Sequence, residues 1–258
     1  RKQPKLEFIP GARHTYNSTT YVVLSEILEK VTDTPADEWI EENIFKPLKM
    51  NHTQIESYVG ELVTNAAESY SFNPEEGYTN EKSNRAIFGA ADVYSSIEDL
   101  KKWFSVFRSD VLGGKEARNL FLAPFILRDG TNSEYALGIR TETHNGLQVY
   151  HHTGGHESFI SQLRYYPDYD LGIVVLTNFG RNGWLSASKI AELFLSTHMT
   201  NSSQKDINQI SVNKNKLEQL EGIYVAKTLN GTLNLSMVDE SLSLNGRNRL
   251  IPTSDNTF

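Results

Sequence analysis

The chain has 258 residues, 38% of them hydrophobic, which is enough to bury one sizeable core and to form one or two domains. Its formal net charge of -7 argues against nucleic acid or an anionic membrane surface as the main partner, and no apolar run approaches the length of an integral membrane segment. Because the chain contains no cysteine, disulfides, thiol catalysis and cysteine-ligated zinc are excluded. The chain starts with Arg1 and not with Met, which indicates a processed chain or a fragment.

The N-terminal segment predicts a loop followed by a helix. Residues 8–16 contain a Pro-Gly pair, which is typical of a loop. Thr19 or Thr20 can cap a helix that runs through about Val31. The helical spacing in this segment is carried by Leu24, Ile27, Leu28 and Val31.

A second helix and an irregular segment follow. Thr34 before Pro35 predicts a helix start, and Pro47 predicts the end of that helix. Residues 56–83 are polar and rich in turn residues, with no sustained period. We therefore expect them to form a surface excursion near the mouth of a functional site.

The middle of the chain predicts a helix and then a strand. Ser95 and Glu98 have the spacing of a capping box and predict the start of the helix. Residues 135–141 are expected to form a strand that leads into a sheet. The expected buried stripe of the helix consists of Leu100, Trp103, Phe104 and Phe107.

Residues 149–178 predict an antiparallel meander and organise the rest of the chain. Residues 159–166 are rich in β-forming side chains, residues 167–170 supply turn chemistry, and residues 171–177 return as an apolar run. Adjacent Gly154 and Gly155 weaken the edge of a strand. One reason to find them there is that a substrate approaches the backbone closely.

The C-terminal part predicts a closing helix, a linker and short strands. Residues 186–197 are expected to form a helix on the sheet, with Ile190, Leu193 and Phe194 at helical spacing. Residues 201–216 are polar and are interpreted as a linker. From Leu217 onward short strands are predicted, with Asn230-Gly231 as a hairpin signal.

Residues 152–178, HTGGHESFISQLRYYPDYDLGIVVLTN, resemble the penicillin-recognising serine hydrolases, which include class C β-lactamases, D-Ala-D-Ala carboxypeptidases, D-aminopeptidases and related esterases. His152-Thr153-Gly154 is similar to their His-x-Gly motif, although Ser158 stands where the family often has Gly. Residues 10–53 also resemble the family, with Lys49 in place of the glycine of a "PLGM" turn. The resemblance implies an α+β fold, an antiparallel sheet flanked by helices.

The segment from Leu217 resembles the opening of the small barrel-like, lipocalin-like domain appended to many family members. Too few residues follow to close an eight-stranded barrel. We therefore expect residues 1–200 to form the C-terminal part of the hydrolase domain, residues 201–216 a linker, and residues 217–258 the start of a truncated all-β domain.

The resemblance implies catalytic roles for a tyrosine and a glycine. Tyr16-Asn17-Ser18 takes the place of the family's Tyr-x-Asn, which makes Tyr16 the candidate base and Ser18 a candidate substrate-binding residue. His152, Thr153 and Gly154 are the other candidate substrate-binding residues. The N–H of Gly155 is the candidate oxyanion donor.

Simpler interpretations of these residues stay open. Tyr16 could be an ordinary amphipathic tyrosine ahead of a helix, and His152 a strand residue on a solvated edge. As a substrate-binding group, His152 would be a pH-dependent cation, which disfavours β-lactamase activity and favours ester or D-peptide substrates. Alternation along a strand separates His151 from His152, so His151, His152 and His156 are not expected to bind a metal. The resemblance implies that neither a metal nor an organic cofactor is needed.

The family's nucleophile, a Ser-x-x-Lys motif placed before Tyr-x-Asn, is not found ahead of Tyr16. The motif occurs only after His152-Thr153-Gly154, and we interpret each occurrence as chance. We therefore expect the functional Ser-x-x-Lys upstream of Arg1. The three occurrences are Ser186/Lys189, Ser202/Lys205 and Ser211/Lys214.

The sequence therefore predicts a parent serine hydrolase that acts on an ester or a D-amino-acid peptide or amide through an acyl-serine. The alternatives are a catalytically inactive homologue that binds peptide or peptidoglycan-like ligands, or a structural, assembling protein. The expected partner is a small-molecule or peptide substrate, and the oligomeric state is open. The resemblance implies a periplasmic or extracellular location at the cell envelope.

Overall fold

The computed structural model describes residues 5–180, 186–200, 212–225, 232–246, 248–250 and 252. The chain divides into two compact units, Arg1–Thr200 and Asn201–Phe258. Within the described residues, no helix is both long enough and apolar enough to cross a membrane.

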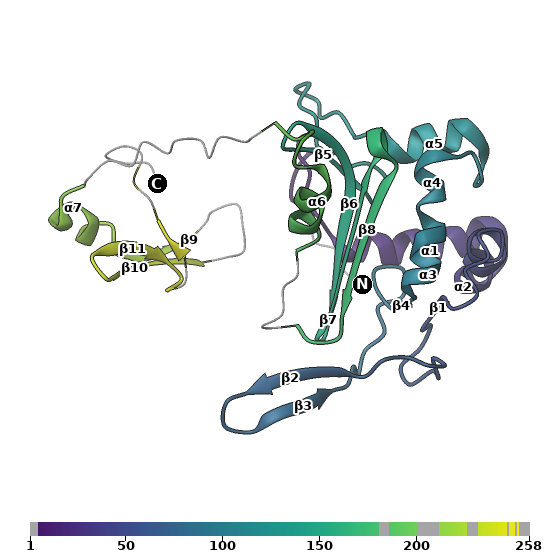
Figure 1. The fold of residues 1–258 in the computed structure, drawn as a ribbon, viewed down its shortest axis with the longest axis horizontal. Helices are drawn as coiled ribbons and strands as arrows, with labels where there is room; N and C mark the ends of the chain where they lie inside the picture. The colour runs from purple at the N-terminus through teal and green to yellow at the C-terminus, as the bar shows by residue number, and fades with distance from the viewer. Residues whose placement is uncertain are drawn as a thin grey trace. The chain divides into compact units, whose positions relative to one another are not determined.

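The larger unit is built on a four-stranded antiparallel sheet (Figure 1). Asn145 and Gly146 connect the first two strands with φ angles of 49° and 85°, as a tight Asn-Gly hairpin requires. The predicted meander is confirmed. In sheet order, the strands are β5 (Arg140–His144), β6 (Leu147–His156), β7 (Phe159–Tyr166) and β8 (Leu171–Thr177), with the 3-10 turn η2 (Pro167–Tyr169) between the last two.

The strand predicted over residues 135–141 begins only at Arg140, so this prediction is wrong for its first half. The N–H of Ala136 donates to the carbonyl of Ile139, and Gly138 has a φ of 85°. The chain therefore turns before β5. Tyr135 still forms an isolated bridge with Arg140, which places it beside the sheet.

The two faces of the sheet pack against different helices. Tyr150, Leu163 and Tyr165 belong to the core on one face, whereas Val149 and Tyr166 belong to the core on the other. This division follows from the alternation of side chains along each strand. Figure 1 shows α3 (Ile97–Trp103) and α4 (Ser105–Arg108) on one side of the sheet and α6 (Ala187–Leu195) on the other.

The first predicted helix is confirmed as α1 (Ser18–Thr32), but neither threonine caps it. Asn17 is the N-cap, and its side-chain oxygen accepts a hydrogen bond from the N–H of Thr20. The apolar side chains at helical spacing are largely exposed, with Val31 78% accessible. The second predicted helix is α2 (Ala36–Ile40), which continues as the π-helix η1 (Glu41–Phe45).

The predicted capping box is displaced by one residue. Ser96 caps α3, because its hydroxyl accepts from the N–H of Asp99, whereas the hydroxyl of Ser95 bonds that of Thr53. Phe104 and Phe107 are buried as predicted. A further helix, α5 (Gly114–Leu122), follows α4.

Residues 56–83 contain a hairpin that the sequence did not predict, formed by β2 (Ser69–Asn73) and β3 (Gly77–Glu81). Most of its side chains are exposed, so the apolar alternation that identifies a strand is absent. Two short strands, β1 (Gln54–Ile55) and β4 (Val93–Tyr94), pair with each other beside this segment.

The predicted closing helix is confirmed as α6, but of Ile190, Leu193 and Phe194 only Ile190 packs against the core. Ala187, Ala191 and Leu195 pack on the sheet, whereas Leu193 is 81% and Phe194 is 68% exposed. Alanine permits a close approach of helix and sheet. Small residues therefore form most of the contact face, although the helical spacing was recognised from large apolar residues.

The smaller unit contains a helix and an antiparallel sheet. The helix α7 (Lys214–Glu218) begins in the segment predicted as a linker, residues 201–216, and ends two residues beyond it. The Asn230-Gly231 turn lies outside the described residues. The described strands have the order β12 (Asn248–Arg249), β11 (Ser241–Leu244), β10 (Thr232–Val238) and β9 (Gly222–Val225).

Candidate functional site

The candidate site lies along one edge of β6. β5 pairs with β6 only as far as His151, which lies opposite Arg140, and no described strand continues that pairing. In an antiparallel ladder successive residues direct their N–H and C=O groups alternately to the two neighbours. The two-residue Asn145-Gly146 turn makes the flanking His144–Leu147 pair a hydrogen-bonded one, so every second residue of β6 from Leu147 onward directs its backbone groups to the β5 side. Thr153 and Gly155 belong to this series but lie beyond the residues that pair with β5, so their backbone groups point toward the open edge. Both residues are exposed.

Gly154 and Gly155 are adjacent, but their local surroundings differ. A Cβ on Gly154 would lie 2.4 Å from the hydroxyl oxygen of Ser161 on β7, so an added side chain requires that hydroxyl to move. A Cβ on Gly155 would meet only Ile160 at 4.0 Å, an ordinary contact. Strand packing therefore accounts for Gly154, and the open edge leaves Gly155 accessible to a ligand.

The structure brings Tyr16 and His152 together although they are far apart in the sequence. Tyr16 lies just before α1, His152 lies on β6, and their ring centroids are 5.9 Å apart. The ring of Tyr135 lies 6.2 Å from Tyr16 and 6.0 Å from His152. These three rings stand beside the exposed edge formed by Thr153 and Gly155.

Both ring nitrogens of His152 are engaged in hydrogen bonds. Nε2 lies 3.0 Å from the hydroxyl of Tyr135, and Nδ1 lies 2.7 Å from the carbonyl oxygen of Thr153. Burial lowers the pKa of His152 below its usual value, and the charge of Arg140 acts in the same direction. The lowered pKa favours the neutral imidazole at pH 7, although the hydrogen bond to the carbonyl of Thr153 acts in the opposite direction.

Four residues around this site were missed by the sequence analysis. His14 stacks on the ring of Tyr135 at 4.8 Å, and the guanidinium of Arg140 lies 5.7 Å from the same ring. Tyr21 of α1 lies next to Tyr135, and burial raises the pKa of both phenols. Of the four, Tyr135 and Arg140 fall in the segment predicted as a strand. Their polar groups within that predicted strand were the only sequence feature that could have marked them as site residues.

The Tyr16-Asn17-Ser18 motif lies at the start of α1. Asn17 uses its side chain to cap the helix, and Ser18 is the first helical residue and is exposed. Tyr16 is half exposed, and the rings beside it are those of Tyr135 and His152. The motif therefore reaches the same site as β6.

The three histidines near the glycines have different partners. His151 is buried on the opposite face from His152 and lies beside Glu142. His156 lies 2.9 Å from the hydroxyl of Ser83 through Nε2. Among the described residues, no group of three or more His, Cys, Asp or Glu side chains could hold a metal ion.

The turn between β6 and β7 is tied to the β2–β3 hairpin. The hydroxyl of Ser158 donates to Glu81 at 2.6 Å, and Ser158 is only 4% exposed. His156 reaches Ser83 in the same region. Ser158, which stands where the resembled family often has Gly, thus anchors the hairpin next to the candidate site.

No Ser-x-x-Lys motif in the described residues reaches this site. Ser186 is the N-cap of α6 and its hydroxyl bonds that of Ser188. Lys189 lies within α6 and bonds Glu192. The helix covers the sheet face opposite His152. Ser202, Lys205 and Ser211 lie outside the described residues.

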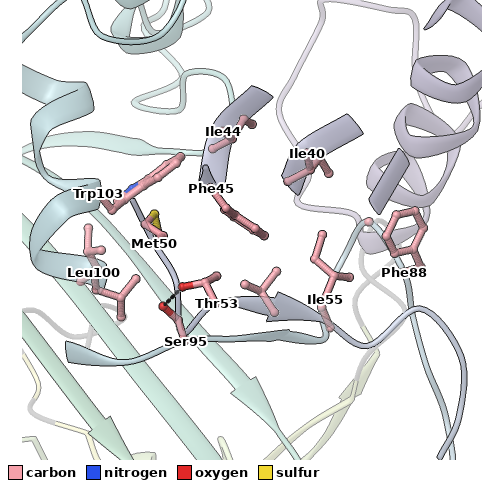
Figure 2. Close-up of a pocket in the computed structure, with 14 residues that line it drawn as sticks. Ile40, Ile44, Phe45, Met50, Thr53, Ile55, Phe88, Ser95, Leu100 and Trp103 are labelled. Carbon is pink, nitrogen blue, oxygen red and sulfur yellow. Dashed lines mark hydrogen bonds between the residues drawn. The ribbon is translucent and has the colours of Figure 1, made fainter. Parts of the chain in front are cut away.

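An apolar cavity of about 310 Å³ lies on the His152 face of the sheet (Figure 2). Leu163 lines it and is the cross-strand partner of His152, so both side chains share one face. Its two hydroxyls, of Thr53 and Ser95, bond each other at 2.8 Å. Figure 2 shows Phe45, Met50 and Trp103 around the same space.

These elements define an α+β protein whose candidate site runs along the open edge of an antiparallel sheet. A family model described as Beta-lactamase matches residues 1–194. The chain therefore belongs to the beta-lactamase family of serine β-lactamases and penicillin-binding proteins, which confirms the resemblance seen in the sequence.

Two curated relatives illustrate the match. A putative D-alanyl-D-alanine carboxypeptidase from Escherichia coli (strain K12) is 42% identical over 52 residues, which is 20% of this chain and 12% of the relative. An N-acetylmuramyl-L-alanine amidase from Bacillus subtilis (strain 168) is 26% identical over 211 residues, 67% of this chain and 46% of the relative. The chain thus spans less than half the length of either.

Two solved structures share the fold. An octameric penicillin-binding protein homologue from Pyrococcus abyssi has a TM-score of 0.64 at 22% identity, covering 92% of this chain and 60% of that chain. A D-stereospecific amidohydrolase from Streptomyces sp. has a TM-score of 0.59 at 24% identity, covering 72% and 55%. They confirm the predicted α+β fold class.

Proposed function

We propose that the protein is a serine hydrolase that cleaves an ester or a D-amino-acid peptide or amide through an acyl-serine intermediate. The observation that carries this proposal is the meeting of Tyr16 and His152, whose rings lie 5.9 Å apart beside the exposed edge of β6. Relatives named as a carboxypeptidase and an amidase support hydrolysis of this type.

In the proposed mechanism the nucleophile is the serine of a Ser-x-x-Lys segment outside these 258 residues. Its hydroxyl attacks the substrate carbonyl while Tyr16 accepts the proton, and the segment's lysine favours the phenolate of Tyr16 by its charge. The outward N–H of Gly155 donates to the oxyanion. Tyr16 then protonates the leaving group, and water hydrolyses the acyl-serine.

The substrate lies along the open edge of β6 in this proposal. Thr153 directs its backbone groups toward that edge, Gly154 contributes a surface without a side chain, and His152 borders the site with its ring. Ser18, at the start of α1, contributes a hydroxyl beside Tyr16. The partner is a small-molecule or peptide substrate, and the location is the periplasm or the exterior of the cell envelope.

A fluorophosphonate that acylates nucleophilic serines tests the proposal. The protein with its Ser-x-x-Lys segment should be labelled, and Tyr16→Phe should slow labelling by roughly 10²–10⁴-fold, the range of a general base. Ser186→Ala serves as the control and should label at the parent rate, because Ser186 lies across the sheet. Residues 1–258 alone should hydrolyse neither p-nitrophenyl esters nor nitrocefin above background.

Labelling of residues 1–258 alone would contradict the proposed nucleophile. Turnover that persists after Ser186, Ser202 and Ser211 are all changed to Ala would do so more strongly. It would show that another group in the chain attacks the substrate.

The second candidate is a catalytically inactive homologue that binds peptide or peptidoglycan-like ligands. Ser18 favours it, because a serine stands where the family's motif has an asparagine. Ligand binding without any fluorophosphonate labelling of the complete protein would establish this candidate and exclude the hydrolase.

A further inference from the structure

The tautomer of His152 follows from its two hydrogen bonds. The carbonyl oxygen of Thr153 can only accept, so Nδ1, which lies 2.7 Å away, carries the proton. In the neutral ring Nε2 is then the acceptor. The hydroxyl of Tyr135, 3.0 Å from Nε2, is therefore the donor.

Tyr135 is held firmly in the position from which it donates. Tyr135 is only 8% exposed, and the ring of His14 stacks on its ring. Tyr135 has one hydroxyl proton and directs it to His152. The phenol of Tyr21 on α1 lies next to Tyr135.

The groups that face the rings of Tyr135 and His152 come from three segments. His14 and Tyr16 come from the loop before α1, Tyr21 comes from α1, and Arg140 comes from β5. None of the described groups facing the ring is a carboxylate, so a second proton on His152 would have no compensating anion. Arg140 is the fixed cation of the group.

We propose that Tyr135 is a positioning residue that holds His152 as a neutral imidazole with its proton on Nδ1 and no N–H group free for a substrate. The substrate group beside His152 is then uncharged, and any carboxylate of the substrate turns toward Arg140. This consequence rests on the proposed function, whereas the state of His152 does not.

Nitrogen-15 NMR of the histidine rings tests the tautomer directly. At pH 7.5 the wild-type protein should show His152 with Nδ1 protonated and Nε2 bare. Tyr135→Phe removes the donor to Nε2, so the other tautomer should become populated and the pKa of His152 should rise by roughly half to one pH unit. Tyr150→Phe is the matched control, because it removes a hydroxyl from the same face of β6 without touching His152, and it should leave both readouts unchanged.

A wild-type His152 that is charged at pH 7.5, or protonated on Nε2, overturns the proposal, as does a folded Tyr135→Phe protein with an unchanged His152 signal. If Tyr135→Phe does not fold, the wild-type spectrum decides the tautomer. Tyr21→Phe, which removes the hydroxyl next to Tyr135, then takes the place of the Tyr135→Phe variant. In the complete protein, the pH profile of fluorophosphonate labelling should shift by the same interval in Tyr135→Phe. A correct tautomer without labelling would reject the hydrolase and leave this inference standing.

Discussion

At the scale of single residues, the site is shaped by close packing as much as by exposed chemistry. Gly154 lies in a motif that resembles a substrate-binding strand, yet a Cβ at this position would overlap the hydroxyl of Ser161 on the neighbouring strand. Gly155, one residue later, has no such restriction. Packing against Ser161 therefore favours glycine at position 154, whereas packing does not restrict position 155.

Substitution of the two glycines separates these reasons. Gly154→Ala should lower the free energy of unfolding by about 1–3 kcal/mol, because its Cβ would overlap the hydroxyl of Ser161. Gly155→Ala should have little effect on stability. Adding Ser161→Ala to Gly154→Ala should restore most of the loss, because the Cβ would then meet only the Cβ of residue 161 at 3.7 Å. Urea denaturation of the three variants and the wild type measures this, and a lack of rescue would show that the contact is not the cause.

At the scale of elements, the β2–β3 hairpin depends on few contacts with the sheet. Its side chains are mostly exposed, and buried Ser158 bonds Glu81 at the end of β3. A hydroxyl bonded to a carboxylate typically contributes about 1.5–3 kcal/mol. The hairpin should therefore open locally before the sheet does.

Ser158→Ala should raise the hydrogen-exchange rates of β2 and β3 by roughly tenfold or more, because a charge-assisted hydrogen bond is lost. The amides of β7 and β8 should exchange as in the wild type. Ser71→Ala is the control, because Ser71 bonds Thr79 on the exposed surface of the same hairpin. Equal effects of the two substitutions would show that Ser158 does not anchor the hairpin.

At the scale of the whole molecule, histidines on both faces of the sheet couple folding to pH. Burial lowers the pKa values of His144, His151 and His152 below the usual 6.5. The unfolded chain binds protons near pH 6.5, whereas the folded chain binds them only at lower pH. The stabilisation is therefore complete above about pH 6.5 and is lost as the pH falls from there toward the folded-state values.

The melting temperature should accordingly be higher at pH 7.5 than at pH 5.5. His144→Gln should reduce this difference, because one of the three buried groups no longer titrates. His198→Gln is the control, because His198 is exposed, and it should leave the difference unchanged. A wild-type melting temperature that rises on acidification would contradict the lowered pKa values.

The sequence by itself determined the elements whose signals are local. The meander of β6, β7 and β8 was predictable because β-rich runs and turn residues alternate there, and α1 because its apolar spacing is regular. The family was recognisable from residues 152–178. Tyr16 and His152 were likewise predicted as candidate site residues from motifs that a linear chain displays.

The tertiary structure alone decided which faces are buried and what surrounds the site. The helix α6 packs through Ala187 and Ala191, because contact depends on how closely two elements approach and not on which side chains are most apolar. The hairpin and the role of Ser158 depend on partners distant in sequence. The lowered pKa of His152 and its contact with Tyr135 likewise depend on the folded structure, because hydrogen bonds and desolvation act through space, and no spacing along the chain records them.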